Sequence, residues 1–251
     1  MDESYRQYLA EGEQAGLRYA LTVPRNVPSG LAGVQLGQRA GASLEFKDHR
    51  DYQPGDDLRF IDWQAYARSD RLTVKLYREE VNPHVDLLLD GSASMALAET
   101  DKARAALVAA GATVAAASNA SYSHMAHLAG DGCHPIQRGS AAPRAWDGIA
   151  FDHTTSLADA LGRMPPRFRP HGIRVLISDL LFMGDPVRTL EEIVHQSSAT
   201  YVVQILAEPD VDPPQRGNIR LVDSETGELQ EVFIDAAAQK RYRDNLARHQ
   251  D

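Results

Sequence analysis

The chain between residues 84 and 206 alternates apolar runs of strand length with helical segments. VDLLLD at 85–90, IRVLISD at 173–179 and TYVVQILA at 200–207 are rich in apolar residues, as expected for strands covered on both faces. SHMAHLAGDGCHPIQRG at 123–139 predicts two short strands around a Gly-Asp-Gly turn. This succession predicts an α/β fold with a doubly wound, mainly parallel sheet and helices on both of its faces.

Three longer helices are predicted between these strands, together with a short one in AAPRAWDGIAF at 141–151. In TDKARAALVAAGATVAAAS at 100–118, Thr100 suits the N-cap and small apolar residues recur at helical spacing. A second helix is expected to begin after Ser156 and to end before PPRFRP at 165–170, because proline disrupts a helix interior. Pro186 opens the third helix, since proline is favoured in the first turn.

Both flanks of this central region are richer in charge and in strand-like patterns. Residues 43–83 combine alternating stretches, such as LTVKLY at 72–77, with a Pro-Gly-Asp-Asp turn. NIRLVDSETGELQEVFID at 218–235 predicts a hairpin around Ser-Glu-Thr-Gly-Glu, followed by a polar helix at 236–249. The sequence therefore predicts an N-terminal helix and β-rich flank at 1–83, a central domain at 84–208, and a C-terminal hairpin and helix at 209–251 that packs with the N-terminal flank.

The composition limits the cellular locations and the classes of partner that we expect for the chain. The 251 residues are 43% hydrophobic and 24% charged and contain no apolar run long enough to span a bilayer. The acidic N-terminus lacks the features of a signal peptide, and a single cysteine, Cys133, suits a reducing compartment, so we expect a cytoplasmic location. A net charge of −9 argues against nucleic acid, which binds clustered Lys and Arg.

A small polar cluster follows the first buried strand, in LLLDGSASM at 87–95. Asp90, Ser92 and Ser94 are two residues apart, so an extended backbone would point their oxygens to one side. In a doubly wound sheet, ligands bind beyond the carboxyl ends of the strands, where Asp179 is also expected. One carboxylate and two hydroxyls are hard donors suited to Mg²⁺ or Mn²⁺. Alternatively, these residues cap the start of a helix.

DGSAS resembles the Asp-x-Ser-x-Ser pattern of von Willebrand factor A-type domains. The resemblance implies a metal-ion-dependent adhesion site, which a threonine from a later loop and an aspartate after the next strand complete. TTSLADAL supplies Thr155 and VLISDL supplies Asp179. The implied metal ligands are Asp90, Ser92, Ser94, Thr155 and Asp179, with Mg²⁺ as the expected ion and Mn²⁺ as the alternative.

The N-terminal flank is similar to a second, longer pattern. EFKDHRDYQPGDDLRFIDWQAYARSDRLTVKLYREE, placed just before DGSASM, resembles the signature of domain of unknown function family fifty-eight, and the later DSETGE resembles that family too. The resemblance to this bacterial family implies a von Willebrand factor A-like, Rossmann-like fold. It also implies a partner. Members of the family are commonly encoded beside MoxR-type AAA+ ATPases, and the implied role is that of an adaptor or assembly factor for the ATPase.

Together these observations predict a non-enzymatic module for protein interaction. The expected ion would be held by Ser92, Ser94 and Thr155, directly or through water, and one open position would accept a carboxylate from a partner. A haloacid-dehalogenase-like phosphatase is the enzymatic alternative, but its nucleophilic aspartate would fall on Leu88. No Gly-x-Ser-x-Gly, Walker or His-Glu-x-x-His motif occurs. A scaffold without bound metal is the third possibility.

Two further groups of residues carry weaker signals. The PGDDLRFIDW cluster at 54–63 predicts charge-assisted hydrogen bonds that fasten the flank, and the alternative is a docking surface with Arg50, Arg59 and Arg68 exposed. The nine histidines form no recognisable metal pattern, so structural or surface roles are expected for them and for Cys133.

Overall fold

A computed structural model describes residues 2–22, 44–79, 83–182, 185–212 and 217–250. The chain forms two compact units, Arg25–Asn82 and the combination of Met1–Pro24 with Pro83–Asp251. The predicted N-terminal flank therefore divides between the two units, and its residues 23–43 lie outside the described residues.

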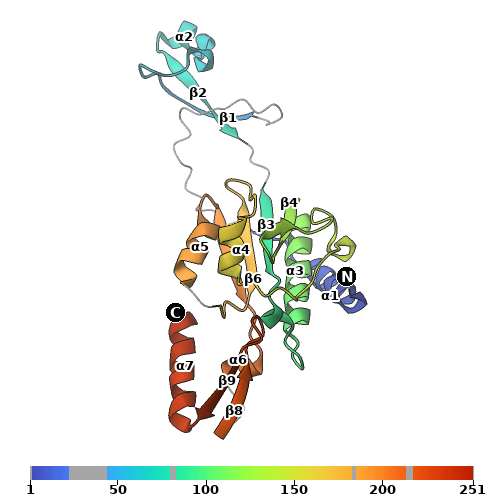
Figure 1. The fold of residues 1–251 in the computed structure, drawn as a ribbon. Helices are drawn as coiled ribbons and strands as arrows, with labels where there is room; N and C mark the ends of the chain where they lie inside the picture. The colour runs from blue at the N-terminus through green and yellow to red at the C-terminus, as the bar shows by residue number, and fades with distance from the viewer. Residues whose placement is uncertain (1, 23–43, 80–82, 183–184, 213–216, 251) are drawn as a thin grey trace. The chain divides into compact units, whose positions relative to one another are not determined.

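A five-stranded sheet forms the centre of the larger unit (Figure 1). Its strands are β3 (His84–Asp90), β4 (Ser123–Ala129), β5 (Cys133–Pro135), β6 (Ile173–Ser178) and β7 (Ala199–Gln204), in the order β5-β4-β3-β6-β7. All neighbours pair in parallel except β5, which pairs antiparallel with β4. This mixed sheet confirms the predicted α/β class and is compatible with a Rossmann-like fold. The chain order reverses at the central strand β3.

One face of the sheet is covered by α3 (Lys102–Asn119) and α1 (Glu3–Gly16). Leu87, Leu107 and Trp146 belong to the buried core on this side. The helices approach so closely that a Cβ on Gly12 would overlap the carbonyl oxygen of Val108. The prediction that the N-terminal helix belongs to the β-rich flank is therefore wrong, because α1 is bound into the larger unit through contacts with α3.

The other face is covered by α4 (Leu157–Arg163) and α5 (Pro186–Val194), around a core that includes Leu88, Leu176 and Ile193. Ser156 caps α4 by accepting a hydrogen bond from the Asp159 amide, as predicted. Thr100 does not cap α3. That helix follows Asp101, and the Thr100 hydroxyl instead donates to the carbonyl of Leu97.

The C-terminal segment contains α6 (Glu208–Val211), the hairpin of β8 (Gly217–Val222) and β9 (Leu229–Ile234), and α7 (Ala236–Gln250). The predicted hairpin and helix are confirmed. His249 on α7 donates from its Nε2 to the carbonyl of Leu180, 2.8 Å away, and Tyr242 donates to the carbonyl of Asp210 at 2.6 Å. These bonds fasten α7 to the segments that follow β6 and β7.

The smaller unit contains an antiparallel pair, β1 (Leu44–Asp51) and β2 (Thr73–Glu79), with α2 (Trp63–Ser69) and the 3-10 turn η1 (Leu58–Phe60) between them. Asp62 caps α2 and also bonds His49 at 2.7 Å. Arg50 forms a bidentate pair with Asp56 at 2.6 and 2.8 Å. These contacts favour the structural interpretation of the PGDDLRFIDW cluster. Among the described residues the two hairpins form separate sheets, and contact between the flanks stays a prediction.

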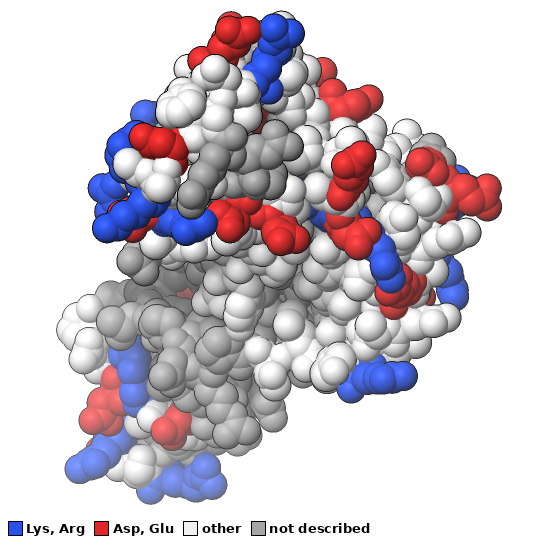
Figure 2. All heavy atoms as spheres, turned by 90° about the horizontal axis from the view of Figure 1, so that it is seen from below, with Lys and Arg blue, Asp and Glu red and all other residues white. Residues whose placement is uncertain are grey.

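The surface carries charged side chains of both signs. On the face seen in Figure 2, Lys and Arg are interspersed with Asp and Glu and form no continuous basic surface. None of the helices within the described ranges is long and apolar enough to cross a membrane.

Candidate metal site

The predicted site lies where the chain order reverses, at the carboxyl ends of β3 and β6. Asp90 is the last residue of β3, and Asp179 directly follows β6. Gly91 allows the chain to leave β3 here, because a Cβ at this position would lie 2.6 Å from the carbonyl oxygen of Ala129. The 3-10 turn η2 (Ala93–Ala96) then carries Ser94. This is the edge at which doubly wound sheets bind ligands.

Asp90, Ser92 and Ser94 come together as the alternation of the sequence predicts. The Asp90 carboxylate accepts hydrogen bonds from the Ser92 amide at 3.0 Å and from the Ser178 hydroxyl at 2.6 Å. The hydroxyl oxygens of Ser92 and Ser94 are 3.0 Å apart. Ser92 precedes η2, but its side chain caps no backbone group in the described part of the chain. The helix-cap interpretation therefore does not account for the two hydroxyls.

Thr155 reaches the same edge through a bridge between two loops. The Ala93 amide donates to the carbonyl of His153 at 2.9 Å, and the His153 amide donates to the carbonyl of Gly91 at 3.2 Å. Thr155 is buried, and its hydroxyl lies 3.5 Å from a guanidinium nitrogen of Arg163. Since the neighbouring Ser156 caps α4, the Thr155 hydroxyl is not needed as a helix cap.

Asp179 is held by a buried lysine that sequence reasoning missed. The Lys102 ammonium lies 2.7 Å from Asp179 and 3.0 Å from Asp210, and the lysine side chain is only 2% exposed. The other Asp179 oxygen accepts from the amide of Leu181 at 3.0 Å. Lys102 opens α3, where the helix dipole disfavours a cation, and this unfavourable position was the available sequence signal for a buried acidic partner.

The site is electrostatically negative. Burial raises the pKa of Asp90, although hydrogen bonds from Ser178 and Ser92 act in the opposite direction. Glu225, at the tip of the β8–β9 hairpin, is a second residue that sequence reasoning did not place here. Its burial, together with the charges of Asp90, Asp223 and Asp179, raises the pKa of Glu225 to about 7. A cation bound among these groups would relieve their mutual repulsion.

The donor set fits a hard divalent ion. Three hydroxyls and two carboxylates are the oxygen donors that Mg²⁺ and Mn²⁺ prefer. Both carboxylates already accept hydrogen bonds, so they suit the orientation of bound water better than exclusive direct ligation. Within the described ranges, no three His, Cys, Asp or Glu side chains form a group that could hold a metal. The candidate set has only two carboxylates, and its other three donors are hydroxyls. Ion binding at this site stays a prediction.

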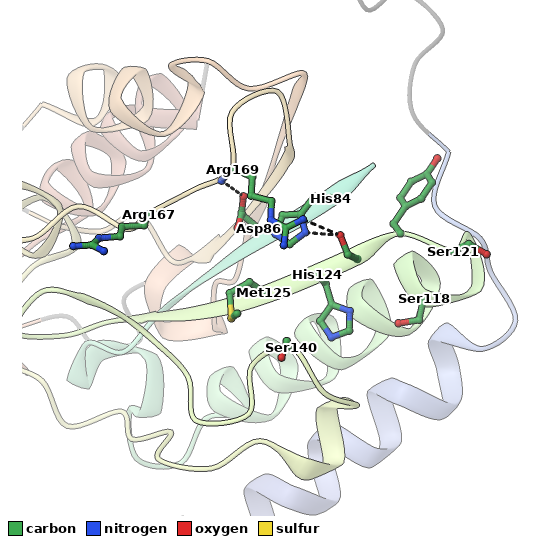
Figure 3. Close-up of a pocket in the computed structure, with 11 residues that line it drawn as sticks. His84, Asp86, Ser118, Ser121, His124, Met125, Ser140, Arg167 and Arg169 are labelled. Carbon is green, nitrogen blue, oxygen red and sulfur yellow. Dashed lines mark hydrogen bonds and ion pairs between the residues drawn. The ribbon is translucent and has the colours of Figure 1, made fainter. Parts of the chain in front are cut away.

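A separate pocket of about 590 Å³ opens at the amino end of the sheet (Figure 3). His84 lies 3.1 Å from Asp86 through its Nε2 and 2.8 Å from the Ser123 hydroxyl through its Nδ1. The Arg169 amide donates to the same aspartate at 2.8 Å. Asp, His and Ser in this order are also the elements of a hydrolase triad. Here they join β3, β4 and the loop before β6, at the opposite end of β3 from Asp90.

The scan against protein families matches the model described as "Protein of unknown function DUF58" over residues 48–251. The chain belongs to the DUF58 family. The matched range of this DUF58 chain includes both the PGDDLRFIDW cluster and the C-terminal hairpin. The family name assigns no activity.

Relatives of the DUF58 chain occur in mycobacteria. It is 30% identical over 244 residues to uncharacterized proteins Mb1516 of Mycobacterium bovis and Rv1480 of Mycobacterium tuberculosis, covering 91% of this chain and 74% of each relative. No solved structure matches the chain. The comparisons thus establish the family and leave the chemistry of the site to be inferred from its residues.

Proposed function

We propose that this DUF58 chain is a non-enzymatic protein-interaction module with a von Willebrand factor A-like domain, which binds Mg²⁺ or Mn²⁺ at a metal-ion-dependent adhesion site. The observation that carries the proposal is the pair of Ser92 and Ser94 hydroxyls, 3.0 Å apart at the sheet's switch point. Thr155 is brought to the same edge by the loop bridge through His153. These hydroxyls need an explanation other than helix capping.

The five residues divide into two roles. Ser92, Ser94 and Thr155 would hold the ion directly or through water, because hydroxyls are neutral hard donors. Asp90 and Asp179 would supply negative charge and orient water, since their oxygens already face Ser178 and Lys102. When bound, the ion would supply a positive centre with one position open to a carboxylate from a partner.

The partner class follows from the family resemblance and from this chemistry. A protein that presents an acidic side chain would be bridged to the chain through the ion. We therefore propose a MoxR-type AAA+ ATPase, or a client of one, as the partner, with the chain acting as its adaptor or assembly factor. A single buried carboxylate–metal contact would give such an interface geometric specificity.

Calorimetric titration with Mg²⁺ and Mn²⁺ tests the site. Wild-type protein should bind, and Asp90→Ala should abolish binding, because the buried carboxylate orients Ser92 and supplies charge. Asp131→Ala is the matched control, since Asp131 is exposed in the turn between β4 and β5 at the same edge. Capture of a co-encoded AAA+ ATPase should be lost in chelator. Absence of binding by both ions would refute the metal mechanism.

Lys102 favours a second candidate, a scaffold without bound metal. Its ammonium already neutralises part of the charge of Asp179 and Asp210, at 2.7 and 3.0 Å. In that case Asp90→Ala would leave partner capture intact. The phosphatase alternative has less support, because Leu88, at the position of its nucleophile, is buried in the core beside α4. Phosphatase turnover that disappears in Asp90→Ala would revive it.

A further inference from the structure

The tip of the β8–β9 hairpin is a turn defined by its own hydrogen bonds. The Asp223 carboxylate accepts from the amides of Glu225 and Thr226, both at 2.8 Å. The Gly227 amide donates to the carbonyl of Asp223 at 2.9 Å, and Gly227 has a φ of +71°, which favours glycine. The backbone of Glu225 is thereby fixed. Its carboxylate accepts no hydrogen bond from the described part of the chain.

This turn meets the candidate metal site. Figure 1 shows the hairpin reaching the edge of the sheet where β3 and β6 end. Glu225 is partly buried there, whereas its neighbours Ser224 and Thr226 are exposed. Its carboxylate interacts electrostatically with Asp90 and Asp179, and also with Asp159 at the start of α4. Glu225 is therefore partly shielded from solvent and close enough to these acidic residues to interact with them.

Such a position is unfavourable for a carboxylate unless a cation lies close by. Asp90, Asp179 and Glu225 are all acidic side chains, and burial strengthens the repulsion between them when they are ionised. The Lys102 ammonium is already shared between Asp179 and Asp210. A divalent ion held by the hydroxyls of the site would convert this repulsion into attraction. A carboxylate with no hydrogen-bond partner is also free to become a metal ligand.

We propose that Glu225 is an intramolecular ligand of the metal site, so that the hairpin occupies the position that a partner's acidic side chain would take. This inference rests on the proposed function. It identifies the hairpin as a built-in competitor: a partner gains access only when its carboxylate displaces Glu225. The inference also indicates which kind of partner group the site would accept: a glutamate carried on a tight turn at the end of a two-stranded hairpin.

Metal titration of full-length variants tests the assignment. Glu225→Gln should weaken the affinity for Mg²⁺ and Mn²⁺ by about tenfold or more, the loss typical when a group that supports a metal site is removed. Glu228→Gln is the matched control, because Glu228 lies in the same turn, is exposed and carries the same charge. Its affinity should equal that of wild type. Circular dichroism would verify that each variant is folded.

Hydrogen exchange gives a second readout that does not depend on affinity. Mg²⁺ should slow exchange of the amides at 217–234 in wild type and in Glu228→Gln, because the bound ion would tie the hairpin to the sheet. It should have no such effect in Glu225→Gln. If wild type binds metal but Glu225→Gln binds it equally well, the intramolecular ligand is refuted and the proposed function stands. If wild type binds neither ion, both proposals fail.

Discussion

The buried ion cluster around Lys102 allows a quantitative test of what stabilises the candidate site. Lys102→Met keeps the length and apolar stem of the side chain but removes the ammonium that faces Asp179 at 2.7 Å and Asp210 at 3.0 Å. The side chains of Lys102, Asp179 and Asp210 are 2%, 3% and 13% exposed, so water cannot replace the lost partner easily. Removing one member of such a buried cluster costs roughly 3–5 kcal/mol.

The control is a charge of the same sign on the same helix. Arg104 pairs with Glu11 at 3.1 Å, but both side chains are 48% exposed. Exposed pairs contribute roughly 0–1 kcal/mol, so Arg104→Met should have little effect on the free energy of unfolding. The contrast between the two variants isolates burial as the cause.

Urea denaturation monitored by tryptophan fluorescence measures both variants. The chain has two tryptophans, Trp63 in the smaller unit and the buried Trp146 in the larger one. A Trp63→Phe background makes Trp146 the sole tryptophan reporter of the larger unit. If Lys102→Met loses no more stability than Arg104→Met, the ammonium does not compensate the buried carboxylates and our account of the site's charge is wrong.

Three other predictions follow from local geometry. Gly12→Ala should destabilise the larger unit by about 1–3 kcal/mol in urea denaturation through overlap with α3, whereas Gly162→Ala, with open space around its Cβ, should stabilise it by about 0.5–1 kcal/mol. Burial raises the pKa of Cys133 to about 12, so Ellman's reagent at pH 8 should modify this thiol only after unfolding, and rapid labelling of native protein would contradict its burial. Ser123→Ala should not change the background hydrolysis of p-nitrophenyl acetate; turnover that disappears in this variant would show that the Asp86–His84–Ser123 chain is catalytic.

Local patterns predicted much of the fold and the first part of the site. The apolar run 85–90 identified the central strand, and the alternation of Asp90, Ser92 and Ser94 placed three oxygens together without any tertiary information. The cap at Ser156 was equally readable, because its hydrogen bond spans only three residues. The N-cap of α3 was predicted one residue too early, at Thr100 and not at Asp101, because Thr and Asp are both suitable N-cap residues.

The remainder of the site depends on segments that meet only in three dimensions. Lys102 and Asp179 are 77 positions apart, and no periodicity links them. Glu225 reaches the site because a hairpin at the end of the chain folds back toward the first strand of the sheet. In the sequence, Glu225 stands in an ordinary turn, and the unfavourable position of Lys102 at a helix start does not identify its acidic partners. Packing in the folded chain buries Lys102 against Asp179 and partly buries Glu225.

The placement of α1 against α3 has a consequence for the order in which the larger unit is completed. During synthesis, α1 leaves the ribosome before α3, so its packing surface around Val108 and Ala112 exists only after residues 17–101 have also been made. The smaller unit is synthesised within that interval. A fragment that starts at residue 48, where the family match begins, would leave this apolar side of α3 uncovered and prone to aggregation, even though it retains every proposed metal ligand.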